Sequence, residues 1–430
     1  MERLLIIDNT TPKYTLHSYN GKVSTLMYSV GNKTRLEQLV EDYSEHYKDI
    51  VIISEYANQL NELAGFKGIS DKVNIWNKSN IDLYGYDVKY LVPQNDSEFE
   101  SKLEDFHTTN VSRYFNSIEV NDEEGIVYKK AITDKGIKLQ NIEGDYYITF
   151  SNVSSLCPML GWDMNNHVLH LKKLNAKTCT EYIKEHPSKA VHIYNKFIEA
   201  VNELHHLDID IQDDEQDCEE ALYNELIDMI DVRVKPCKKL IDSIGTIDTF
   251  NDMPVTDHKS LMGMLNRWFD YYKEKAKFCL VHGDPNTDNC MYDEEQDKVY
   301  FIDPRGYFGT LKTLGYGLLD YDFAKLLYGM TGYSQFNNAP YISVNHEGTN
   351  IDVWVGNNVK GRNKVKGIST LDIDMLTENN DIKILVGIIW MKLTSYIIND
   401  PIKSVAAYYH GNALLTKYLR EFYKTHTFTK

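Results

Sequence analysis

The most constraining feature of this chain is a pair of short apolar runs that each end in an acidic residue. Residues 278–281 (Phe-Cys-Leu-Val) lead through a His-Gly pair to Asp284, and residues 299–302 (Val-Tyr-Phe-Ile) lead directly to Asp303. Asn289 follows Asp284 by five residues. Short apolar runs bounded by turn residues are typical of buried strands. The fold must therefore deliver two carboxylates and an amide from strand ends into loops.

This set of side chains suits phosphoryl transfer. Transfer from ATP needs a carboxylate beside the attacking hydroxyl and oxygen ligands that hold Mg²⁺ on the phosphates. Asp284, Asn289 and Asp303 offer hard oxygen donors, which Mg²⁺ prefers and which zinc and copper do not. A His-Gly-Asp triplet alone is a weak signal, whereas the whole pattern, with Asp303 placed 14 residues after Asn289, is far more restrictive.

The same segment resembles a known family. It is similar to the catalytic loop and metal-binding Asp of the aminoglycoside phosphotransferase/choline kinase superfamily, which are relatives of protein kinases that phosphorylate small molecules. Residues 321–326 (Tyr-Asp-Phe-Ala-Lys-Leu) resemble a helix start whose Asp braces the catalytic loop in that superfamily. Residues 302–309 (Ile-Asp-Pro-Arg-Gly-Tyr-Phe-Gly) are most similar to a bacterial branch associated with surface-polysaccharide genes. The resemblance extends over residues 108–430.

The resemblance implies a role for each residue of the motif. Asp284 is the expected catalytic base or hydroxyl orienter, and His282 is expected to hold the loop in shape. Asn289 and Asp303 are the expected Mg²⁺ ligands. ATP and Mg²⁺ are the implied cofactors, and a hydroxyl of a sugar, an amino alcohol or an aminoglycoside-like metabolite is the implied acceptor.

The family also implies a strand lysine, paired with a helical Glu, that grips the nucleotide phosphates. Residues 125–131 (Gly-Ile-Val-Tyr-Lys-Lys-Ala) offer Lys129 and Lys130, and strand alternation allows only one of them to face the cleft. Similarity to the strand ending of the family favours Lys130 and leaves Lys129 as the alternative. Glu143, on a helix predicted around residues 139–146, is the expected partner.

The N-terminal part of the chain lies outside this resemblance. Strands predicted at residues 4–7 and 50–53 bracket a helix whose start carries a capping box of Thr34 and Glu37, and residues 88–92 form a further predicted strand. We expect a small accessory α/β domain over residues 1–105.

Beyond it, the pattern predicts an α+β fold, and the resemblance implies a bilobal protein-kinase-like arrangement preceded by the α/β domain. A hairpin of residues 114–120 and 126–131 begins a small β-rich N-lobe over residues 106–175. Helical periodicity dominates a larger C-lobe over residues 176–430, in which residues 340–370 form an insertion suited to a β-hairpin.

Composition excludes several other classes of function. The chain has 46 Lys+Arg against 63 Asp+Glu, a formal charge of −17, which disfavours binding to nucleic acids and to anionic membranes. The same charge would attract cationic acceptors to the helical lobe. The six cysteines form no Cys-x-x-Cys pair, and the most apolar stretch, residues 384–398, is too short to span a bilayer. We therefore expect a cytoplasmic protein, and the resemblance implies a nucleotide and a small molecule as its partners.

Two alternatives remain open at this point. A protein kinase is disfavoured because Asp303 is followed by Pro-Arg-Gly rather than Phe-Gly. A non-catalytic pseudokinase scaffold would be expected to lack a metal ligand or the base, and here all three are present. The chain does depart from the family in lacking a Gly-x-Gly-x-x-Gly loop over the phosphates; the turn at residues 121–125, with one glycine, would have to take its place.

Overall fold

The structure, a computed structural model, describes most of the chain after residue 115 and separate parts of the chain before it. The described residues are 2–9, 16–18, 21–23, 26, 29–30, 33–44, 49–54, 57–76, 86–91, 116–339, 341–356, 365–368, 371–397 and 401–426. Within them the six cysteines are free thiols. In the same parts of the chain, no helix combines the length and the apolar character that a bilayer crossing requires.

The N-terminal unit is a four-stranded parallel sheet in the order β7-β6-β1-β8. Thr34 and Glu37 form the predicted capping box at the start of α1: the Glu37 N–H donates to Thr34 Oγ1 at 3.2 Å, and Glu37 Oε2 accepts the Thr34 N–H at 2.7 Å. The strands and helices of this unit are β1 (Glu2–Asn9), β2 (Leu16–Ser18), β3 (Gly21–Val23), β4 (Ser29–Val30), β5 (Lys33–Thr34), α1 (Arg35–Ser44), β6 (Asp49–Ser54), α2 (Ala57–Phe66), β7 (Asn74–Trp76) and β8 (Tyr86–Leu91). The predicted strands and helix are confirmed.

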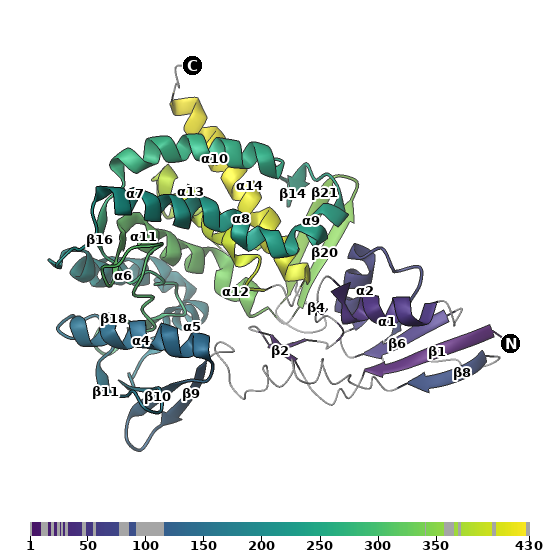
Figure 1. Cartoon of the computed structure of the whole chain (residues 1–430), viewed down its shortest axis with the longest axis horizontal. Coiled ribbons are helices and arrows are strands. Elements are labelled where there is room, and N and C mark those ends of the chain that lie inside the picture. The colour runs from purple at the N-terminus through teal and green to yellow at the C-terminus, as the bar shows by residue number, and fades with distance from the viewer. Residues whose placement is uncertain are drawn as a thin grey trace.

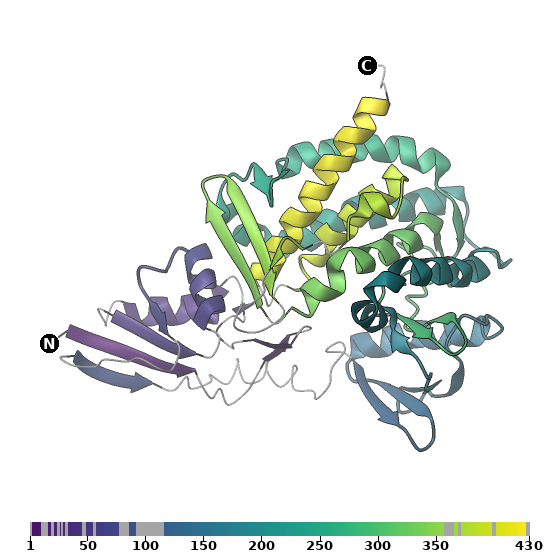
Figure 2. The same cartoon turned by 180° about the vertical axis from the view of Figure 1, so that it is seen from behind.

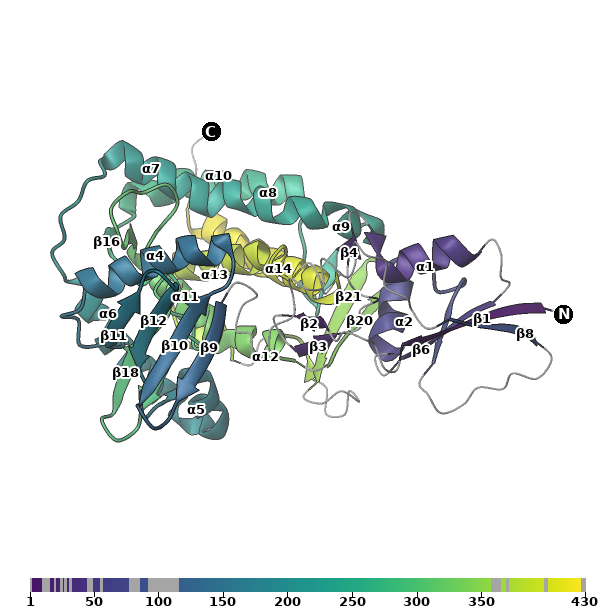
Figure 3. The ribbon, with the colours of Figure 1, turned by 60° about the horizontal axis from the view of Figure 1, so that its bottom comes forward.

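An antiparallel sheet and one helix make up the small lobe. The sheet has the order β11-β12-β10-β9, and α4 lies along it (Figure 3). Thr133 caps α4 by accepting the N–H of Gly136 at 3.1 Å, as expected for a Thr before a helix. The elements are β9 (Asn116–Asn121), β10 (Ile126–Ala131), α4 (Asp134–Thr149), β11 (Met159–Asp163) and β12 (Val168–Lys172). The predicted hairpin is β9–β10.

The larger lobe is mainly helical. Trp268 and Trp390 are fully buried in its core. Its helices are α5 (Cys179–Glu185), α6 (Ala190–His205), α7 (Glu215–Tyr223), α8 (Met229–Val234), α9 (Lys238–Ile244), α10 (His258–Tyr272), α11 (Leu319–Tyr328), α12 (Ser334–Asn337), α13 (Asn380–Leu393) and α14 (Pro401–Thr425). Helix α13 begins earlier than its apolar run because the Asn379 side chain accepts the N–H of Asp381 at 3.0 Å and so caps the helix.

Short strands of this lobe form two structures that position the site. The first is a hairpin of β17 and β18, and the second is the antiparallel pair β16–β19. The insertion forms the predicted hairpin, β20–β21. The strands are β13 (Lys177–Thr178), β14 (Thr249–Phe250), β15 (Met253–Pro254), β16 (Phe278–Leu280), β17 (Cys290–Asp293), β18 (Lys298–Phe301), β19 (Tyr316–Leu318), β20 (Tyr341–Glu347), β21 (Asn350–Gly356) and β22 (Val365–Lys366).

The small lobe and the N-terminal unit lie at opposite ends of the helical lobe (Figures 1 and 2). Helix α2 packs beside β20 and α14, so the insertion lies next to the N-terminal unit. The predicted fold class, a small β-rich lobe and a larger helical lobe after an α/β unit, is confirmed. The predicted boundary at residues 105/106 lies outside the described residues, and the boundary at residues 175/176, between β12 and β13, stays a prediction.

Candidate active site

A buried carboxylate from a distant helix holds the loop that carries Asp284. This loop follows β16 and contains His282 and Gly283. Asp322, in the first turn of α11, is fully buried and accepts the backbone N–H of His282 at 2.9 Å and that of Gly283 at 2.8 Å. Hydrogen bonds to an ionised acceptor are stronger than neutral ones. Asp322 therefore fixes the backbone immediately before Asp284.

His282 connects this loop to the strand that precedes Asp303. Its Nε2 donates to the carbonyl oxygen of Ile302 at 3.0 Å, and its Nδ1 accepts the N–H of Asp284 at 3.3 Å. Burial lowers the pKa of His282, in agreement with a neutral ring whose proton is on Nε2. The side chain is fully buried, so its position is that of a residue that holds the loop in shape.

Two other side chains of the loop are close to Asp284. Its Oδ1 lies 3.0 Å from the ammonium of Lys325 and accepts from Asn286 Nδ2 at 3.2 Å. Asn289 is buried, and its Nδ2 donates to the backbone carbonyl of Asp284 at 2.9 Å. This bond fixes the amide of Asn289 with Oδ1 as the atom suited to a cation. The loop thus presents a carboxylate and an amide from a single turn.

On the small lobe, one lysine joins two carboxylates. The Nζ of Lys129 lies 2.6 Å from Oε2 of Glu143, on α4, and also pairs with Oδ1 of Asp303. Burial alone would lower the pKa of the Lys129 ammonium, but the two carboxylates raise it above its ordinary value, so the side chain stays charged. Asp303 has a φ of 60°, and its N–H donates to the hydroxyl of Tyr147 at 3.2 Å. Three elements therefore meet at Asp303.

The structure corrects the choice between the two strand lysines. Lys129 is buried, whereas Lys130, favoured by the sequence, is exposed on the opposite face of β10. Val127 packs against the buried core, and alternation along a strand then turns Lys129 to the same side. The choice of Lys130 from sequence similarity was wrong because a register difference of one residue places every side chain of a strand on the opposite face. The predicted partner Glu143 lies beside Lys129.

The two predicted metal ligands lie at the same end of the β17–β18 hairpin. The N–H of Ile302, the residue before Asp303, donates to the carbonyl of Asn289 at 3.0 Å. Among the described residues, no group of three or more His, Cys, Asp or Glu side chains is arranged to hold a metal ion. Mg²⁺ on a nucleotide usually takes only one or two protein carboxylates, with phosphates and water as its other ligands. The donor set of Asn289 and Asp303 fits that pattern.

The comparison with protein families covers this site. Residues 160–348 match the family model described as "Phosphotransferase enzyme family" (APH). The match agrees with the resemblance inferred from the sequence. The match contains the Asp284 loop, Asn289, Asp303 and α11, and the predicted class of enzyme, a small-molecule kinase, is confirmed. A search of curated proteins found no match to the chain.

Solved structures similar to this chain include three bacterial proteins. A choline/ethanolamine kinase family protein from Mesorhizobium loti is 12% identical, with a TM-score of 0.40 over 71% of this chain and 88% of that one. Choline kinase LicA from Streptococcus pneumoniae is 12% identical, with a TM-score of 0.40 over 72% and 92%. Aminoglycoside phosphotransferase APH(3'')-Id from Streptomyces rimosus is 16% identical, with a TM-score of 0.34 over 50% and 74%. Values this low indicate nothing about the substrate of this chain.

A largely buried cluster of charges lies behind this site, and no sequence pattern indicated it. The cluster consists of Glu225, Arg305, Tyr321 and Lys392. Arg305 makes two bonds to the Glu225 carboxylate, at 3.0 and 3.1 Å, and Tyr321 donates to it at 3.1 Å. Lys392 pairs with the same carboxylate and donates to the Glu225 carbonyl at 3.0 Å. Glu225 lies in a π-helical turn, Asn224–Asp228, between α7 and α8.

The neighbouring charges determine the protonation state of the Glu225 carboxylate. Burial alone would raise the pKa of Glu225, but Arg305 and Lys392 hold it well below its usual value. Burial lowers the pKa of Lys392 to about 8, with Glu225 opposing the shift. The carboxylate is therefore ionised at neutral pH. Only packing brings these residues together, and a π-turn leaves no sequence signature that could have revealed them.

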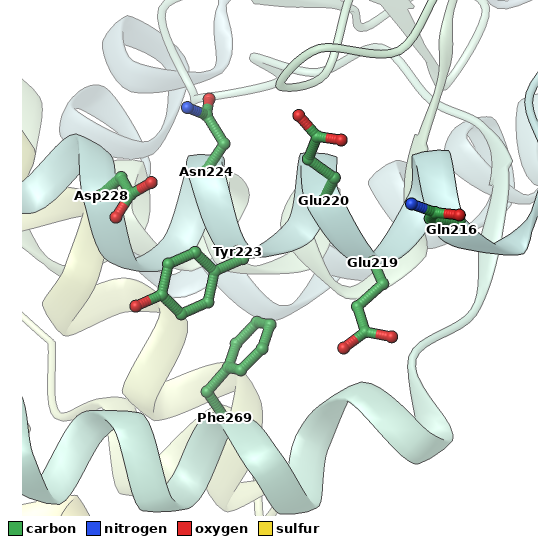
Figure 4. A pocket seen from close by; sticks show the side chains of 7 residues that line it. All are labelled: Gln216, Glu219, Glu220, Tyr223, Asn224, Asp228 and Phe269. Carbon is green, nitrogen blue, oxygen red and sulfur yellow. The ribbon is translucent and has the colours of Figure 1, made fainter.

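A separate hollow of about 370 Å³ lies between α7 and α10 (Figure 4). It is lined by Gln216, Glu219, Glu220, Tyr223, Asn224, Asp228 and Phe269. Glu219 pairs with Lys273 at 2.6 Å, and the Tyr223 hydroxyl donates to Asn266 at 3.3 Å. None of the predicted site residues lines this hollow, so it is distinct from the site around Asp284.

Proposed function

We propose that the chain is an ATP- and Mg²⁺-dependent kinase that phosphorylates a hydroxyl of a small molecule, with a sugar, an amino alcohol or an aminoglycoside-like metabolite as acceptor. The observation that carries the proposal is the position of Lys129, which pairs with Glu143 and Asp303 across the two lobes. A phosphate-binding lysine held by a helical Glu, together with a metal-binding Asp, is what kinase chemistry requires. The use of ATP also fits a cytoplasmic location, which stays a prediction.

The roles of the residues follow from their chemistry. Lys129 would bind the α- and β-phosphates of the nucleotide, and Glu143 would hold the lysine in place. Asn289 and Asp303 would hold Mg²⁺, which when bound neutralises the charge that develops on the phosphates. Asp284 would orient the acceptor hydroxyl and accept its proton late in the reaction, because an ordinary carboxylate is a weak base at neutral pH. His282 and Asp322 keep this loop in position through buried bonds.

The reaction balances without a further reactant. The acceptor oxygen forms a bond to the γ-phosphorus as the bond from that phosphorus to the bridging oxygen of ADP breaks. The hydroxyl proton passes to Asp284 and then to solvent. Since no covalent enzyme intermediate is needed, positioning and charge stabilisation account for the catalysis.

Thermal unfolding with nucleotide and metal tests the proposal. A kinase of this kind should gain stability with ATP and Mg²⁺ but much less with ATP and EDTA, because a ligand stabilises the state that binds it. ADP release should then be measured across a library of hydroxyl compounds. A thermal shift that ignores Mg²⁺, with no ADP release from any compound, would favour the alternative of a non-catalytic scaffold.

A further inference from the structure

Lys325, which has no part in the roles proposed above, lies directly against Asp284. Its Nζ is 3.0 Å from Oδ1 of Asp284, and the two side chains are 15% and 18% exposed. Lys325 lies three residues after Asp322 on α11. One turn of helix therefore supplies both the carboxylate that fixes the loop backbone and the cation that faces the carboxylate of the base.

The same ammonium lies close to two buried tyrosine rings. Nζ of Lys325 is 5.7 Å from the centroid of the Tyr321 ring and 5.6 Å from that of Tyr328. A cation within about 6 Å of a ring centroid is attracted to the ring. A carboxylate flanked by aromatic rings would also be a suitable binding site for a cationic acceptor. Here a lysine of the enzyme already occupies that position.

A further layer of charges lies behind the loop that carries Asp284. Arg305 and Lys392 share the single carboxylate of Glu225. Arg305 lies against the base loop: its N–H donates to the carbonyl of His282 at 2.8 Å, and a Cβ on Gly283 would be 2.9 Å from the Arg305 Cβ. The carboxylates of Asp322 and Asp303 also lie beside this loop, so the pairing with Lys325, and not a positive charge of the whole region, offsets the charge of Asp284.

From these contacts, and on the basis of the proposed function, we infer that Lys325 positions Asp284 and sets the acceptor specificity. The acceptor is a neutral or anionic alcohol, such as a sugar or an acidic sugar derivative, and does not carry a cationic nitrogen beside the reacting hydroxyl. A hydroxyl within hydrogen-bond reach of Asp284 lies within about 8 Å of the Lys325 ammonium. At this range in a partly buried site, a second cation is repelled with little screening.

Matched pairs of acceptors test the inference. ADP release with Mg²⁺–ATP is measured for glucose against glucosamine, and for 3,3-dimethylbutan-1-ol against choline, within the library of hydroxyl compounds. Members of a pair have similar shapes and differ in charge. We expect kcat/KM to be at least tenfold higher for the neutral member. A wild-type enzyme that prefers the cationic members overturns the inference and leaves the proposed function standing.

Variants of Lys325 separate specificity from a merely structural role. Lys325→Met should reduce kcat, leave the KM for ATP unchanged and lower the neutral-to-cationic ratio at least tenfold, whereas Lys325→Arg should keep the ratio. Lys238→Met, at a lysine that is 65% exposed on α9, serves as the matched control and should change nothing. Equal losses on both members of each pair would overturn the inference. A folded protein that binds Mg²⁺–ATP but phosphorylates no compound would overturn the proposed function, and the inference with it.

Discussion

The ammonium of Lys129 lies 2.6 Å from Oε2 of Glu143, and it also pairs with the carboxylate of Asp303. These contacts connect β10 and α4 of the small lobe to Asp303, which follows β18 in the helical lobe. The next residue, Lys130, is exposed on the other face of the same strand. The chain thus offers two neighbouring lysines of equal chemistry, of which only one reaches the site.

Lys129→Met should reduce kcat/KM for ATP by on the order of a hundredfold or more, because it removes a preorganised charge from the phosphate site. Lys130→Met should stay within about threefold of wild type, since surface substitutions rarely disturb a distant site. Steady-state ADP release at varied ATP measures both, and circular dichroism checks that each variant is folded. Equal losses in the two variants would show that Lys129 is not the phosphate-binding residue.

Substitutions of the proposed metal ligand and of the proposed base should have different effects on nucleotide binding and on turnover. Asp303→Ala should abolish the Mg²⁺-dependent part of the thermal shift with ATP, because one of the two proposed protein ligands is lost. Asp284→Asn should keep that shift and reduce turnover by orders of magnitude, since it removes the group that orients the hydroxyl. Near-normal turnover in Asp284→Asn would contradict the assignment of the base.

Asp322→Ala should destabilise the protein and reduce its activity. The substitution leaves the buried N–H groups of His282 and Gly283 without their acceptor, and each unsatisfied group costs about 1–3 kcal/mol. Thermal unfolding should show a melting temperature lower by several degrees. Asp322→Asn, which keeps one acceptor oxygen, should be intermediate. Asp270→Ala, at an exposed position on α10, is the control, and an equal drop there would contradict the role of Asp322.

His410 should make the stability of the helical lobe depend on pH. Burial against Trp390 lowers the pKa of His410 to about 3, and neither ring nitrogen has a hydrogen-bond partner among the described residues. The unfolded chain binds a proton here below a pH of about 6.5, whereas the folded chain does not. Stability is therefore greatest above that pH and falls on acidification toward pH 3, by up to about 1.4 kcal/mol per pH unit.

His410→Phe removes this titration and keeps an aromatic ring beside Trp390. The melting temperature of the variant relative to wild type should therefore rise progressively from pH 7.5 to pH 5, as measured by thermal unfolding at each pH. His206→Phe, at an exposed position, should follow the wild-type curve. If the melting temperatures of His410→Phe and wild type change with pH in parallel, the pKa of His410 does not differ between the folded and unfolded chain in the way expected here.

Much of the fold and part of the site could be predicted because the signals are local. The capping box of Thr34 and Glu37, the β9–β10 hairpin and the helical periodicity of α14 each depend on residues a few positions apart. The spacing of Asp284 and Asn289 likewise fits one turn, in which the amide bonds the backbone of the Asp. The roles proposed for these residues remain predictions.

The sequence by itself determined the elements and the loop that carries Asp284, since hydrophobic period, caps and turns act over short distances along the chain. Only the tertiary structure decided that Lys129 and not Lys130 meets Glu143, because the packing of Val127 sets the face of the strand. Packing alone also brought Lys325 to Asp284 and Lys392 to Glu225, the latter pair 167 positions apart in the chain. Pairs so distant are selected by the burial of charge against charge, which no local pattern records.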